Sequence, residues 1–83
     1  MIWRYIASRK RVKGILNPEL QHIWEVREYY YPDEEGGHAW TEDAIEPFGT
    51  SREELIQSLE MMLEDVKRGD YLDLDEEKVT EVE

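Results

Sequence analysis

The sequence contains no cysteine. This excludes a disulfide framework, a thiolate metal site and a cysteine nucleophile. Long apolar runs are also absent: none approaches the length of a membrane span, and the first residues place charges after a very short apolar stretch, unlike a signal peptide. We therefore expect a soluble, cytoplasmic protein with no membrane partner.

Histidine is scarce, with only His22 and His38 present. The two could meet across a hairpin and, with Glu28 or Glu42, bind a metal or transfer protons. No HxH, HExxH or HxxxH spacing supports this, which favours ordinary surface histidines near strand ends. No serine lies in a GxSxG context. We predict a protein that is not an enzyme, with no catalytic residue, no metal and no cofactor.

Basic residues are also few, with 10 Lys and Arg against 21 Asp and Glu, for a formal net charge of -11. The charge is uneven: residues 1–31 carry six basic and three acidic residues, and residues 32–83 carry four basic and eighteen acidic residues. An acidic surface repels phosphates and attracts basic proteins, and it also keeps a small protein soluble. We expect no direct nucleic-acid contact, and we interpret the RKRVK segment at 9–13 as a basic turn that is either solvated or paired with the acidic tail.

One segment, from Pro47 to Gly69, has a complete set of helix signals. Ser51 and Glu54 form a capping box, in which each side chain bonds the other's backbone amide, and Gly69 allows a left-handed stop. Six apolar residues recur at helical spacing and form what we call the apolar stripe: Leu55, Ile56, Leu59, Met62, Leu63 and Val66.

The residues before the helix predict three strands, at 2–9, 21–31 and 38–44, joined by a connection at 10–20 and a glycine turn at 32–37. The fold class is α+β: a three-stranded antiparallel sheet packed by one C-terminal helix, in β-β-β-α order. Tyr71, Leu72 and Leu74 either close the helix end or add a short edge strand. Residues 1–75 form a single domain, and residues 76–83 form an acidic, flexible tail.

A single helix covers only one face of such a sheet, so the other face keeps large apolar groups. The uncovered set is either Trp3, Tyr5, Trp24 and Trp40, or Ile2, Ile6, Ile23, Tyr29 and Tyr31. Either set would form a contact surface for a second copy or another protein, unless charged side chains and the 10–20 connection cover it. The predicted partner-binding residues are Trp3, Tyr5, Trp24, Tyr29, Tyr31, Trp40, Glu60 and Glu64.

The acidic helix side allows two interpretations. Glu60 and Glu64 could steer a protein partner with a basic surface toward the aromatic face. Alternatively, an acidic set could imitate phosphates and inhibit an enzyme that handles DNA or RNA: Glu53, Glu60, Glu64 and Asp65 on the helix, with Asp70, Asp73 and Asp75 beyond it. The first interpretation is an antitoxin-like or inhibitor-like interaction module. A homodimer with only a structural role is a further alternative.

The stretch EVREYYYPDEEGGHAWTEDAIEPFGTSREELIQSLEMML resembles a short, widespread bacterial family of uncharacterised proteins with an EVxxxYY strand, a WTE strand and a PxGxSxEEL helix start. This resemblance covers about half the chain and implies a fold, with no assigned activity. Three strands followed by Gly49, Ser51, Glu53, Glu54 and Leu55 are also similar to the small domain of HicB-type antitoxins, which implies a toxin-like protein partner. Here AIEPFG replaces that family's proline-glycine-cysteine element, and no DNA-binding segment follows the helix.

Overall fold

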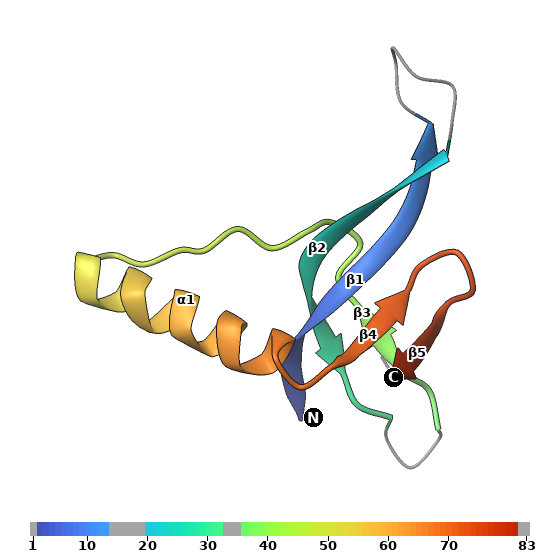
Figure 1. Ribbon diagram of the computed structural model, residues 1–83. Coiled ribbons are helices and arrows are strands. Elements are labelled where there is room, and N and C mark those ends of the chain that lie inside the picture. Colours follow the sequence, from blue (N-terminus) through green and yellow to red (C-terminus); the bar gives the residue numbers. More distant parts are fainter. Residues whose placement is uncertain (1, 14–19, 33–35, 82–83) are drawn as a thin grey trace.

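The structure is a computed structural model that describes residues 2–13, 20–32 and 36–81. These residues form one helix and a curled sheet of five strands, in the order β3-β2-β1-β4-β5 (Figure 1). The elements are β1 (Trp3–Lys13), β2 (Leu20–Tyr30), β3 (Ala39–Trp40), α1 (Arg52–Val66), β4 (Asp70–Asp73) and β5 (Lys78–Glu81). The predicted α+β class with one helix is confirmed.

β1 and β2 form a long antiparallel ribbon, in register from Trp3 opposite Tyr30 to Lys13 opposite Leu20. Both strands lie where aromatic and β-branched residues alternate with polar ones. β1 is longer than predicted, since residues 10–13 extend it instead of forming a connection. The rest of that connection, at 14–19, and the centre of the predicted turn, at 33–35, lie outside the described residues.

The prediction of a three-stranded antiparallel sheet is wrong in strand number and direction. β4 pairs in parallel with β1, with Ala7 opposite Tyr71, and it pairs antiparallel with β5, with Leu72 opposite Val79. β4 is therefore an interior strand and not a short edge strand. Residues 78–81, predicted to lie in a flexible tail, form β5. Both strands are too short to show alternation, and the partner of β4 is distant in sequence, so no local pattern reveals the pairing.

The core lies on one face of the curled sheet. Ile6 and Leu72 are fully buried and Tyr29 is nearly so. Trp40, Leu74 and Val79 are partly buried and pack against these three side chains. The same face also holds buried polar groups, including Arg4, which forms a 2.5 Å ion pair with Asp70. We call this face the core face.

The helix begins and ends where the sequence predicts. The Glu54 amide donates to Ser51 Oγ at 3.2 Å, and Gly69 adopts a φ of 93° just beyond the helix. The Glu54 carboxylate does not bond the Ser51 amide as expected. Instead it accepts from the Thr50 amide at 2.7 Å and from the Thr50 hydroxyl, and these bonds lower the pKa of Glu54.

The prediction that the helix packs across the sheet is wrong. Figure 1 shows α1 extending away from the sheet, with the chain before it running alongside. We call residues 41–51, between β3 and α1, the linker. The linker follows the edge of β2 as far as Ile45, whose amide donates to the Val26 carbonyl at 2.8 Å. It then leaves the sheet, so the helix begins far from it. The last turn meets β1, where the Tyr5 amide donates to Asp65 Oδ2 at 3.0 Å.

Candidate protein interface

The apolar stripe of α1 is largely exposed to solvent. Leu59 and Leu63 are 46% and 54% exposed, and Leu55 and Ile56 are also exposed. Met62, in contrast, is buried within the chain. A helix with an apolar stripe is normally stabilised by burying that stripe against a neighbouring element. The chain as described supplies such cover only toward the end of α1 nearest the sheet.

A second exposed apolar surface lies on the sheet face opposite the core face. We call it the sheet patch, and the strand register places on it Trp3, Tyr5, Ala7, Trp24 and Val26. Trp24 is 53% exposed and Trp3 is 42% exposed. The rings of Trp3 and Tyr5 meet edge to face at 5.1 Å. Part of the patch is a shallow depression of about 310 Å³, lined by Ala7, Trp24, Glu25, Val26 and Val66.

Arg9 holds one side of the sheet patch in place. Its guanidinium lies 4.9 Å from the Tyr71 ring centre and 5.7 Å from that of Trp24, and it pairs with Asp73 at 3.1 Å. Burial raises the pKa of Asp73, but hydrogen bonds from the Glu76 amide, the Arg9 guanidinium and the Asp75 amide outweigh it, so the pKa is lowered. Asp73 therefore stays ionised, and the stacked cation orients Trp24. No local pattern in the sequence indicates this cluster, because Asp73 is remote from Arg9 in sequence.

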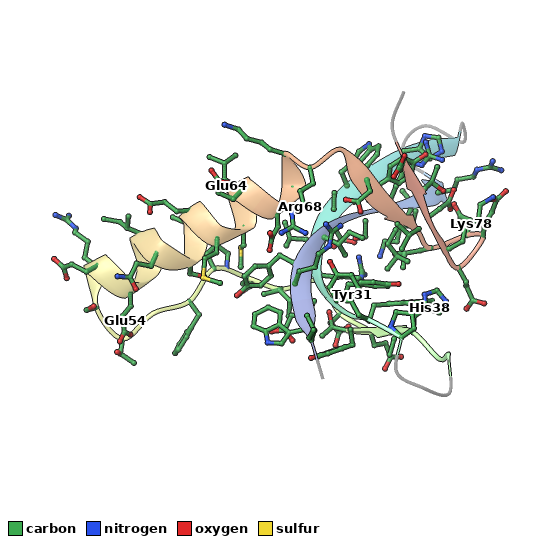
Figure 2. The ribbon with its side chains drawn as sticks, turned by 90° about the horizontal axis from the view of Figure 1, so that it is seen from below. Tyr31, His38, Glu54, Glu64, Arg68 and Lys78 are labelled. Atoms are coloured by element: carbon green, nitrogen blue, oxygen red, sulfur yellow. The ribbon has the colours of Figure 1, made fainter. Side chains whose placement is uncertain are left out.

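Three of the predicted contact aromatics do not belong to the sheet patch. Tyr29 and Trp40 lie opposite each other on the core face, so Trp40 does not share a face with Trp3 as expected. The ring of Tyr31, labelled in Figure 2, meets that of Tyr29 at 5.5 Å. Tyr29 is buried, and this burial, reinforced by Tyr31, raises its pKa. The predicted site is thus divided: Trp3, Tyr5 and Trp24 form an open surface, and Tyr29 and Trp40 contribute to the core.

The histidines lie at opposite ends of β2 and do not meet across it. His22 is opposite Arg11 near the start of the strand. His38 follows the strand and packs against Trp40, with ring centres 5.3 Å apart, while its Nδ1 lies 3.2 Å from the Tyr29 hydroxyl. In residues 2–13, 20–32 and 36–81, no three His, Asp or Glu side chains are grouped to hold a metal ion. Nor is any helix of this described part long and apolar enough to cross a membrane.

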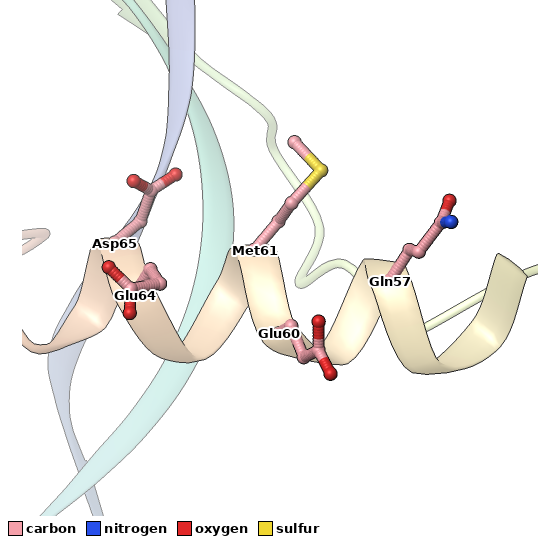
Figure 3. A pocket seen from close by; sticks show the side chains of 5 residues that line it. All are labelled: Gln57, Glu60, Met61, Glu64 and Asp65. Carbon is pink, nitrogen blue, oxygen red and sulfur yellow. The ribbon is translucent and has the colours of Figure 1, made fainter. Parts of the chain in front are cut away.

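Glu60 and Glu64 are both exposed on α1, beside the apolar stripe. Together with Gln57, Met61 and Asp65 they line a shallow depression of about 430 Å³ (Figure 3). Asp65 is half-buried, because it accepts the Tyr5 amide and lies 3.5 Å from Arg68. Glu60 and Glu64 are therefore the carboxylates of this depression that face solvent and are free to meet a partner.

The chain matches no family model, no curated protein and no solved structure. The two family resemblances stay predictions, and any function rests on the geometry of the stripe, the sheet patch and the acidic helix side.

Proposed function

We propose that this chain is a small, non-enzymatic protein-interaction module. The observation that carries the proposal is the exposure of the apolar stripe on a helix that extends away from its own sheet. Contiguous exposed apolar surface of this kind is typical of protein contact sites, which have apolar centres and polar rims. The sheet patch provides a second such surface, and its exposed tryptophans are the residue type most enriched among binding hot spots.

The acidic side of α1 forms a polar rim beside the stripe. Glu60 and Glu64 are exposed there, and the formal charge of the whole chain is -11. A partner with a basic surface would be attracted by this field, which acts more on the association rate than on the final affinity. The proposal therefore combines apolar contacts, which provide affinity, with carboxylates, which select the partner. It assigns no cofactor and no catalytic residue.

The stripe is tested by a matched pair of helix variants in a pull-down from host lysate. Leu59→Glu places a charge within the stripe, and Gln57→Glu adds the same charge on the other side of the helix. We expect Leu59→Glu to lose a specifically retained protein that wild type and Gln57→Glu both recover. Equal recovery by all three would refute a role for the stripe.

The carboxylates are tested by charge reversal at Glu60 and Glu64. Glu60→Lys/Glu64→Lys should slow association with a basic partner by roughly three- to tenfold at low salt and flatten its salt dependence. Glu81→Lys, at an exposed position on β5, is the control for net charge. Binding that depends on Glu60 and Glu64 but not on Leu59, with a nucleic-acid enzyme as partner, would instead support the acidic-mimic alternative.

A further inference from the structure

The two unpartnered apolar surfaces of this chain complement each other. One is the apolar stripe, convex and carried on an extended helix, and the other is the sheet patch, shallow and open at Trp24. A two-fold dimer uses the same surface on both copies, so each contact is made twice. Resting on the proposed function, we infer that the partner is a second copy of this chain, and that the stripe of each helix packs on the sheet patch of the other copy.

The accessible surface of the chain is large enough for such a dimer. A compact monomer of 10.0 kDa exposes about 5,200 Å². The chain exposes 6584 Å², which is about 1,300 Å² more. If each copy buried this excess, the interface would total about 2,600 Å², within the range of obligate homodimers. The radius of gyration, 14.4 Å, also exceeds the ~12 Å of a compact chain of this length.

The core of a single copy is small for a protein that folds alone. Among the described residues, four apolar side chains are buried: Ile6, Tyr29, Met62 and Leu72. Domains only slightly smaller than this one often require a disulfide, a metal or a second subunit for stability. The chain has no cysteine, and packing of Leu59 and Leu63 against Trp24 would add buried apolar groups to both copies. Association and folding should therefore be coupled.

The position of the helix is consistent with this exchange. The end of α1 is attached beside its own sheet patch, where Val66 borders the depression. The helix is about 22 Å long, and the part before its last turn extends away from its own sheet, where another molecule can reach it.

The first experiment is sedimentation equilibrium of the full chain, combined with thermal unfolding over about a hundredfold range of protein concentration. We expect a mass of twice 10.0 kDa and a Tm that rises with concentration. A monomer with a concentration-independent Tm would overturn the inference. This measurement uses wild-type protein, so it holds even if a variant fails to fold.

The second experiment tests the reciprocal contact. Leu59→Glu and Trp24→Lys should each raise the dimer dissociation constant about a hundredfold, because each change enters the interface twice. An equimolar mixture should form a heterodimer more strongly than either variant forms a homodimer. In that heterodimer, one stripe and one patch remain wild type, and the carboxylate introduced in one copy meets the ammonium group introduced in the other. Gln57→Glu, as control, should dimerise like wild type.

The outcomes separate this inference from the proposed function. A dimer lost in Leu59→Glu but unaffected by Trp24→Lys would mean that the helices pack on each other, which overturns exchange onto the sheet. If the wild-type chain is a monomer, self-association is overturned. If it also binds another protein and Leu59→Glu abolishes that binding, the interaction module remains supported. Equal disruption by Gln57→Glu would exclude the stripe as the contact.

Discussion

At the scale of single residues, the most consequential side chain is one that the sequence did not single out. Arg27 is 3% exposed, and its Nη1 donates to Ser8 Oγ at 2.6 Å and to Glu25 Oε1 at 3.3 Å. Ser8 in turn donates to the Glu25 carbonyl at 3.0 Å. Arginines are rarely buried unless paired, so sequence alone gave no reason to place Arg27 inside. The pairing partners come from both long strands, and folding brings them together.

Removal of Ser8 Oγ tests this network. Ser8→Ala leaves the buried Arg27 guanidinium without its shortest hydrogen bond, which should lower the free energy of unfolding by about 1–3 kcal/mol. Urea denaturation at fixed protein concentration measures the change. Ser58→Ala, within α1, is the control and should have little effect, since alanine favours a helix. Equal stability of both variants would show that the network contributes nothing net.

The Asp73 carboxylate gives a pH prediction. Its pKa is lowered in the folded chain, so ionised Asp73 stabilises the fold above the unfolded pKa of about 4. This contribution is lost as the pH falls below that value toward the folded pKa. Asp73→Asn should therefore reduce stability at pH 7 and make the decline in stability below about pH 4 shallower. Acid unfolding followed by circular dichroism, with exposed Asp43→Asn as the control, checks the result.

At the scale of elements, the sequence predicts the helix and the two long strands well, and the reason is local. Ser51 and Gly69 act on the backbone within a few residues, and aromatic and β-branched residues favour an extended backbone over much of β1 and β2. Where α1 packs depends on the linker before it, whose path no periodic pattern encodes. The apolar stripe was therefore identified correctly from the sequence, but the prediction that the stripe packs on the sheet was wrong.

Gly49 fixes the way the linker enters α1. A Cβ there would collide with the Leu55 amide nitrogen and lie 2.7 Å from the Glu54 carbonyl carbon. Both atoms are backbone, so they move only if the start of the helix shifts. Gly49→Ala should cost about 1–3 kcal/mol of stability and fray the first turn. Gly37→Ala has open space around the added methyl and should be neutral. Hydrogen exchange of the α1 amides distinguishes the two variants.

At the scale of the whole molecule, the salt dependence of binding distinguishes a second copy of the chain from a basic protein partner. Two chains of net charge -11 repel each other at long range, and salt screens that repulsion. Dimerisation through the stripe should therefore be as strong or stronger when salt rises from about 50 to 500 mM. Binding of a basic protein should weaken severalfold over the same range. Sedimentation at both salt concentrations measures the first, and a dimer that dissociates at high salt would contradict it.

The parts of the architecture that the sequence missed all depend on distant pairing. β4 reaches β1 across most of the chain, and nothing near Tyr71 or Leu72 indicates that partner. The prediction that Trp40 shares a sheet face with Trp3 was wrong for a similar reason. The face on which Trp40 lies depends on its register with Tyr29, and only the assembled sheet defines that register. The sequence predicted a contact surface that includes Trp3 and Trp24, and both side chains are exposed. It did not predict that the apolar stripe of α1 would be exposed as well.

The parallel pairing of β1 with β4 also has a kinetic consequence. Arg9 and Asp73, which this pairing brings together, are 64 positions apart. Contacts between residues so far apart in sequence form slowly, because closing the intervening loop costs conformational entropy before the contact stabilises the chain. During refolding, we expect the β1–β2 hairpin to form before β4 pairs with β1, which would leave the other edge of β1 open for a time. An open strand edge templates pairing with other chains. Refolding yield should therefore depend on how fast this edge closes, and dilute protein should recover best.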